Sequence, residues 1–203
     1  ANGDGLAELA IESSTGWRLH SARTGVRWLW REPIRVIELC GDMDGDGCAD
    51  FIGVGLAAPP STWCHVFSGR SGERLQAVSL AFGDYHDVQA LGDVDGDDVI
   101  EFVCANYKVG LSQGQVDVFG GAGKLVWSSG PSCHWQYGWA LDVLGDVDGD
   151  GKVDIAVGVD HIRSREDGVV HVLDAGSGRT IAELHRRGDS IRVQKPPAKP
   201  AAK

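Results

Sequence analysis

Several short stretches of this sequence carry carboxylates at a spacing that suits a metal ion. In residues 146–154, Asp146, Asp148, Asp150 and Asp154 stand at positions 1, 3, 5 and 9, and glycines at positions 4 and 6 allow a sharp turn. Crowded oxygen ligands on such a turn suit Ca²⁺, which accepts about six to eight oxygens. Without a cation, the carboxylates repel one another and are harder to ionise. The stretch predicts a calcium loop, and the alternative is an acidic turn that binds nothing.

The pattern recurs at a regular interval. Loop 42–50 keeps all four carboxylates and both glycines, with Asp42, Asp44, Asp46 and Asp50. Loop 93–101 keeps four carboxylates, which are Asp93, Asp95, Asp97 and Glu101. It differs in having Asp98 in place of the second glycine and a glutamate in place of the last aspartate. Residues 1–8 match positions 2 to 9 of a truncated copy. The complete loops start at residues 42, 93 and 146, and this period of about 50 residues is typical of a repeat architecture.

The residues around these loops exclude the commonest acidic loop. An EF-hand requires a bidentate glutamate at position 12 and flanking helices, but position 12 here is Gly53, Cys104 or Val157. Dockerin and thrombospondin-type calcium repeats recur at much shorter spacing. The flanks are rich in Val, Ile and aromatic residues and bounded by Gly and Asp, as strands are; they are 34–39, 51–56, 86–91, 102–107, 139–144 and 155–159.

Glycine turns complete each repeat. They fall at 21–25, 68–72, 120–123 and 174–178, each between two further short strand-like runs. Four short antiparallel strands per period describe one propeller blade. The sequence therefore predicts an all-β propeller of about four blades over residues 1–193, with a truncated first blade, followed by a flexible Pro/Ala/Lys-rich tail at 194–203. Residues 188–193 could supply the missing first strand and close a four-bladed ring, but we favour a fragment of a larger propeller.

Bulk properties exclude several classes of protein. The formal charge of −10 argues against non-specific nucleic-acid binding, which needs Lys and Arg to neutralise phosphates. No apolar run is long enough to cross a membrane. Neither a signal peptide nor an initiating Met is present, which suggests a mature product or an excised fragment. The five cysteines show no C-x-x-C pairing, and Cys40 and Cys104 are expected in the core.

The arrangement resembles the FG-GAP (or VCBS-like) repeats of the integrin α-subunit β-propeller and of exported bacterial proteins. The residues that carry the resemblance lie before, within and after each acidic loop. In the last repeat they are residues 137–140, 144–151 and 154–158, and the matching runs in the earlier repeats are residues 82–83, 91–101 and 39–53. It implies Ca²⁺ held by the side chains at positions 1, 3, 5 and 9 and the main-chain carbonyl at position 7, which adds Cys48, Val99 and Lys152. Binding is expected to be weaker at 93–101. The truncated copy offers a partial site at Asn2, Asp4, Leu6 and Glu8.

The resemblance implies a calcium-stabilised, extracellular or cell-surface adhesion module that binds a protein or glycan partner on one propeller face. It also implies assembly with further blades of a parent chain. The alternative is a carbohydrate-binding or non-catalytic module of a secreted polysaccharide-active enzyme, with Trp63, Trp135 and Trp139 as stacking platforms. Trp28, Trp30 and Trp127 are assigned to blade packing. We expect no enzymatic activity, because no G-x-S-x-G or H-E-x-x-H motif is present and the histidines are scattered over different repeats.

Overall fold

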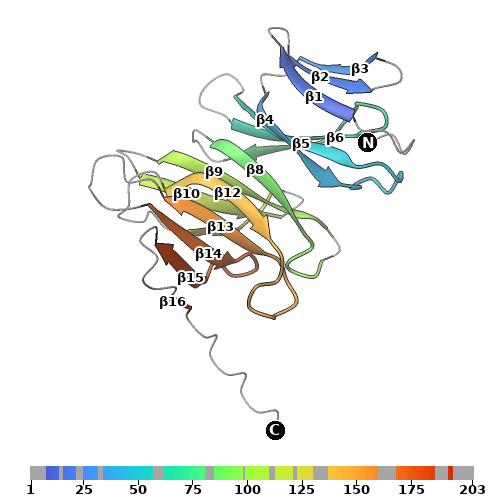
Figure 1. Ribbon diagram of the computed structural model, residues 1–203. Helices are drawn as coiled ribbons and strands as arrows, with labels where there is room; N and C mark the ends of the chain where they lie inside the picture. The colour runs from blue at the N-terminus through green and yellow to red at the C-terminus, as the bar shows by residue number, and fades with distance from the viewer. Residues whose placement is uncertain are drawn as a thin grey trace.

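The computed structural model is an all-β array in which every described element is a strand (Figure 1). It describes residues 8–13, 16–21, 25–31, 34–56, 62–80, 85–97, 99–109, 113–120, 123–129, 137–159, 168–185 and 192–193. Structural statements below refer to these residues. The predicted tail at 194–203 lies outside them.

The strands form four consecutive antiparallel sheets, here called blades 1 to 4. Blade 1 contains β1 (Glu8–Ser13), β2 (Gly16–Ser21) and β3 (Gly25–Trp30). Blade 2 contains β4 (Ile34–Gly41), β5 (Asp50–Leu56), β6 (Thr62–Phe67) and β7 (Arg74–Leu80). Blade 3 contains β8 (Tyr85–Gly92), β9 (Glu101–Val109), β10 (Gln113–Phe119) and β11 (Leu125–Ser129). Blade 4 contains β12 (Tyr137–Leu144), β13 (Asp154–Val159), β14 (Val169–Asp174), β15 (Thr180–His185) and β16 (Arg192–Val193).

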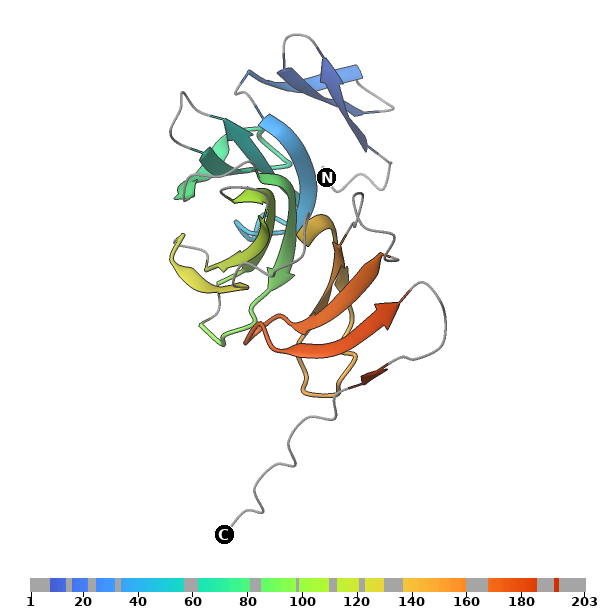
Figure 2. The same cartoon turned by 90° about the vertical axis from the view of Figure 1, so that its left-hand side faces the viewer.

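The blades follow one another along an arc, with blade 1 at one end and blade 4 at the other (Figure 2). In each of blades 2 to 4 the first strand lies innermost, and β8 contacts both β4 and β12. Within a blade, each strand pairs with the next by a simple up-and-down ladder. This is the meandering order of a propeller blade, and it confirms the predicted fold and the strands predicted on either side of each loop.

The hydrophobic cores lie between successive blades. One cluster joins blades 3 and 4 and includes Val116, Val118, Tyr137 and Val157. A second joins blades 2 and 3 and includes Val66, Cys64 and Cys104, and a third joins blades 1 and 2. Strands that are buried on both faces read as nearly continuous apolar runs, as in β13 (Asp-Ile-Ala-Val-Gly-Val). Each blade is therefore stabilised mainly by its neighbours.

Tryptophans of the outer strands join blade 1 to the glycine turn of blade 2, and blade 3 to the glycine turn of blade 4. The Trp127 indole Nε1 donates to the Ala175 carbonyl at 2.7 Å, and Trp28 Nε1 donates to the Gly69 carbonyl at 3.3 Å. The turn glycines Gly178 and Gly72 lie under these indoles with φ of +71° and +72°. The assignment of Trp28, Trp30 and Trp127 to blade packing is confirmed.

Replacing Gly178 with alanine is expected to lower the free energy of unfolding by about 2 kcal/mol, since a left-handed backbone costs an L-residue roughly 1–2 kcal/mol. A Cβ at this position would also lie 2.8 Å from the Trp127 ring. The matched control is Gly25→Ala, where φ is +77° but no atom lies within 4 Å of the added Cβ. Urea denaturation measures both; equal losses would contradict the packing role of Gly178.

One detail differs from the sequence-based expectation. Of the predicted strand at 188–193, the structure describes Arg192–Val193 (β16), which pairs with β15 at the outer edge of blade 4 and does not join blade 1. The four-bladed closure is therefore wrong for this structure. Blade 4 gains a fifth strand as a result, while blade 1 has three. The expectation for cysteines is confirmed: Cys40 and Cys104 are buried free thiols, as are Cys48 and Cys64, and Cys133 lies outside the described residues.

Candidate metal centres

Each acidic loop connects the first two strands of its blade. Loop 42–50 joins β4 to β5, loop 93–101 joins β8 to β9, and loop 146–154 joins β12 to β13. The position-4 glycines Gly45, Gly96 and Gly149 have φ between +74° and +88°. A side chain at these positions would be strained, so the glycine spacing predicted from the sequence has a direct backbone cause.

The first carboxylate organises the turn by accepting main-chain N–H groups. In loop 146–154, Asp146 Oδ1 accepts from Gly149 at 2.6 Å and from Asp150 at 3.1 Å, and Asp146 Oδ2 accepts from Gly151 at 2.9 Å. Asp42 accepts from Asp46 and Gly47, and Asp93 accepts from Gly96 and Asp97. These hydrogen bonds hold the loop in a curve that turns its carboxylates inward.

The last carboxylate is buried at the start of the second strand. Asp50, Glu101 and Asp154 are at most 1% exposed. Each accepts the N–H of the residue at loop position 2, at 2.7 Å from Met43, 2.8 Å from Val94 and 2.7 Å from Val147. Position 9 therefore closes the loop onto its own beginning.

Burial raises the pKa of each of these three carboxyls, because it disfavours the charged form. Neighbouring carboxylates Asp44, Asp95 and Asp148 raise the pKa further, while the donated N–H groups lower it. The loops thus hold carboxylates in positions that favour a compensating positive charge.

Carboxylate oxygens converge in all three loops. One ligand oxygen from each of four residues lies within 4.8 Å of the others in loop 93–101, namely Asp93, Asp95, Asp97 and Glu101. The other two loops gather three residues each at the same spacing, which are Asp42, Asp44 and Asp50, and Asp146, Asp148 and Asp154. All of these donors are hard oxygens, the ligand type that Ca²⁺ prefers.

Glu101 provides a separate sign that this loop suits a cation. Its side chain has no exposed surface, and while Oε2 accepts from Val94, Oε1 has no hydrogen-bond partner among the residues that the structure describes. An unpaired buried carboxylate oxygen is costly, so native structures seldom leave one without a compensating group. A cation within the cluster would provide that compensation.

Two predicted position-5 ligands lie outside these clusters. Asp46 Oδ2 instead accepts from Arg70 Nε at 3.0 Å, and Asp150 Oδ1 accepts from the Lys152 N–H at 2.9 Å. Of the position-7 residues, Cys48 is buried, Val99 is exposed, and the Lys152 ammonium donates to the Val94 carbonyl in blade 3. In the truncated copy, Asn2, Asp4 and Leu6 lie outside the described residues, and Glu8 begins β1.

Two arginines enter the loops from the glycine turns of their own blades, and sequence reasoning missed both. Arg179 Nη2 lies 2.7 Å from Asp148 Oδ2, and Arg70 pairs with Asp46. The available signal was a basic residue within or directly after the glycine turn of each blade.

A family comparison agrees with this geometry. Residues 137–173, which span β12, loop 146–154, β13 and β14 up to Leu173, match the FG-GAP repeat. The chain is a β-propeller-like protein that contains an FG-GAP repeat. No curated protein matches its sequence. In this FG-GAP-like chain, the matched repeat is the one with the complete acidic loop of blade 4.

Solved propellers share the fold of the FG-GAP-like chain. The Dos1 propeller superposes with a TM-score of 0.59 at 11% sequence identity, over 94% of this chain and 45% of that one. Sqt1 from Saccharomyces cerevisiae superposes with a TM-score of 0.60 at 12% identity, over 91% of this chain and 48% of that one. The chain thus spans about half the length of these propellers, and the likeness shows the fold alone.

Proposed function

We propose that the FG-GAP-like chain is a calcium-binding interaction module in which Ca²⁺ is mainly structural. The observation that carries this proposal is the convergence of carboxylate oxygens in three loops, together with the buried Glu101 Oε1, which has no hydrogen-bond partner in the described part of the chain. A cation bound there would neutralise the crowded charge and fix the connection between the first two strands of each blade. Because it would bind only the folded loop, it would stabilise the blade by mass action.

Calorimetric titration of the chelator-treated chain with CaCl₂ tests this proposal. We expect saturable binding at the three complete loops and much weaker binding of Mg²⁺, which demands a stricter octahedral geometry. The sequence predicted weaker binding at loop 93–101 than at the other two complete loops. Four of its carboxylates converge, against three in each of the other two loops, which leads us to rank it first instead. Absence of saturable calcium binding would refute the proposal.

Replacing Arg179 with glutamine is expected to raise the calcium affinity of loop 146–154 by about two- to fivefold, because partly exposed ion pairs are worth ~0.2–1 kcal/mol. The guanidinium competes with a cation for Asp148, a member of the cluster. Arg70→Gln is the matched control, since Arg70 pairs with Asp46 outside its cluster. Calorimetry measures both variants. A fall in affinity for Arg179→Gln would instead mean that the arginine positions Asp148 for the ion.

We further propose that the module works outside the cell, at the cell surface, and binds a protein or glycan rather than catalysing a reaction. The FG-GAP match and the calcium loops support this role, since millimolar extracellular Ca²⁺ can saturate even weak sites of ~10⁻⁴–10⁻³ M. Within the described ranges, the chain has no helix able to span a bilayer. Surface biotinylation of cells that express the parent chain tests the location; labelling only after lysis would contradict it.

One observation favours the glycan alternative. Trp139 of β12 is 48% exposed, and its ring lies 6.5 Å from the His86 ring. An exposed indole offers a flat apolar face that suits stacking. Of the other candidates, Trp63 is half-buried beside His65, and Trp135 lies outside the described residues. Binding to a glycan array that disappears in Trp139→Ala would support the glycan alternative. Unchanged binding by the variant would rule out this role of Trp139.

A further inference from the structure

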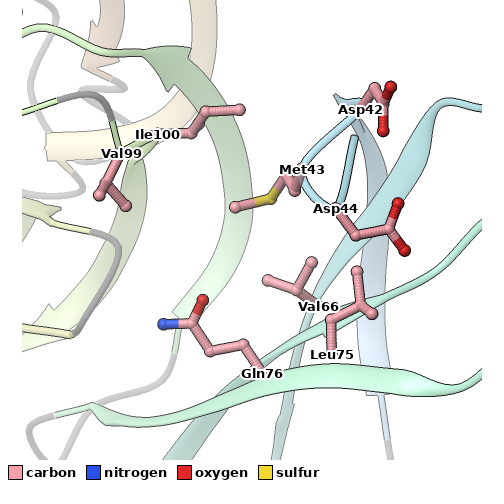
Figure 3. A pocket seen from close by; sticks show the side chains of 8 residues that line it. All are labelled: Asp42, Met43, Asp44, Val66, Leu75, Gln76, Val99 and Ile100. Atoms are coloured by element: carbon pink, nitrogen blue, oxygen red, sulfur yellow. The ribbon is translucent and has the colours of Figure 1, made fainter. Parts of the chain in front are cut away.

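A cleft opens between blades 2 and 3 beside loop 42–50 (Figure 3). It has a volume of about 390 Å³ and a mixed lining. Asp42 and Asp44 lie along one side, Val99 and Ile100 of loop 93–101 lie across from them, and Met43 extends between the two sides. Val66, Leu75 and Gln76 line the remainder. The cleft therefore combines apolar walls with two exposed carboxylates.

The equivalent position between blades 3 and 4 is filled by side chains of the protein itself. Strand register makes Gln76 the counterpart of Trp127, because Gln76 pairs with Val66 and Trp127 pairs with Val118. At loop position 7, Val99 is the counterpart of Lys152. Between blades 3 and 4, Trp127 packs against the core and the Lys152 ammonium donates to the carbonyl of Val94, the counterpart of Met43.

The cleft between blades 2 and 3 therefore stays open for a defined reason. A short valine replaces the lysine that crosses the other junction, and glutamine replaces the tryptophan. The stem of Lys152 runs close to Gly176 on its way to Val94, with its Cδ 3.2 Å from where a Cβ would stand. Lysine suits such a path because its apolar stem can pack while the charged end reaches an acceptor.

We propose that this cleft binds a lysine side chain presented by a partner protein. The stem would lie along Val66, Leu75 and Val99, and the ammonium would reach the Met43 carbonyl as Lys152 reaches that of Val94. Asp42 and Asp44 supply complementary charge at the rim, which steers and orients a cation. The inference rests on the cleft and on the repeat comparison, and it stands whether or not the acidic loops bind calcium.

Methyl NMR titration with Nα-acetyl-lysine amide tests the proposal, in EDTA and again in millimolar CaCl₂. We expect saturable shifts at Val66, Leu75, Val99 and Ile100 with a dissociation constant on the order of millimolar, and weaker binding with calcium present. Nα,Nε-diacetyl-lysine amide, which lacks the positive charge, is the matched probe and is expected to give none. Equal shifts from both probes, or no saturable shift from either, would overturn the proposal.

A second experiment fills the cleft with a side chain of the protein itself. Val99→Lys is expected to abolish binding of the lysine probe and to raise the midpoint of thermal unfolding, as its ammonium reaches Met43. Leu184→Lys, on the exposed outer strand of blade 4, is the control and is expected to leave binding intact. Retained binding in Val99→Lys would refute the site. Binding seen only in EDTA would show that the amine merely replaces a cation on Asp42 and Asp44, which would also refute it.

Discussion

Glutamine in place of Glu101 is expected to make the calcium-free protein more stable and the calcium-bound protein less stable. Without calcium, the change removes a buried charge whose Oε1 has no partner within the described ranges, while the amide oxygen still accepts from Val94. Relief of such a group is worth about 1–2 kcal/mol. With calcium, the loop loses one of its four converging carboxylates. A site filled to ~100 times its dissociation constant contributes about 2.7 kcal/mol, most of which the variant forfeits.

The effect of Glu101→Gln on stability is expected to have opposite signs without and with calcium, and this distinguishes a cation site from an acidic turn. Urea denaturation in EDTA and in millimolar CaCl₂ measures it, with Glu73→Gln as the control because Glu73 is an exposed residue of the blade 2 turn. The control is expected to stay within about 0.5 kcal/mol of the parent in both conditions. If Glu101→Gln shifted stability in the same direction in both, its carboxylate would have a structural role only.

Truncation of Trp30 to alanine is expected to lower the free energy of unfolding by about 3–5 kcal/mol, the usual cost of removing a buried indole. Trp30 is 3% exposed, and its ring centroid lies 5.4 Å from Phe51 and 5.1 Å from Phe67 of blade 2. Its Nε1 also donates to the Gly72 carbonyl at 2.9 Å. Because this cluster joins blade 1 to blade 2, blade 1 is expected to separate first.

Trp139→Ala is the matched control for Trp30, since it deletes the same side chain from an exposed position. It is expected to cost less than about 1 kcal/mol. Denaturation followed by far-UV circular dichroism measures both variants. Similar losses from the two tryptophans would contradict the role of Trp30 as the link between blades 1 and 2.

The repeat made most of the fold predictable. Glycine and aspartate residues mark the ends of each strand in the sequence. The strand predicted at 34–39 therefore appears as Ile34–Gly41, and the strand predicted at 155–159 appears as Asp154–Val159. The exception is the strand at 188–193. Its sequence resembles the first strand of a blade, but a resemblance says nothing about which sheet edge lies nearest. The free edge of β15 is closer along the chain than β1, and β16 pairs with it.

The candidate sites were predictable only in part. The spacing within each loop showed which carboxylates share a turn. In the structure, ligand oxygens from ten of the predicted residues converge in the three loops. Spacing could not show that Asp46 turns toward Arg70 or that Arg179 reaches Asp148, because these partners lie 24 and 31 residues away in sequence. The link from Lys152 to Val94 joins two different blades. Such contacts depend on how the loops of one blade fold together and on how neighbouring blades pack, and a local sequence pattern encodes neither.

Thermal unfolding in excess EDTA and in millimolar CaCl₂ tests most directly the claim that the acidic loops are calcium sites. We predict a midpoint higher by several degrees with calcium, since each kcal/mol shifts a domain of this size by about 2–4 °C. Asp146→Ala combined with Asp148→Ala is predicted to lose part of that gain while the loops at 42–50 and 93–101 keep theirs. A cooperative transition with the same midpoint in both solutions would contradict the claim and leave the loops as acidic turns of a propeller.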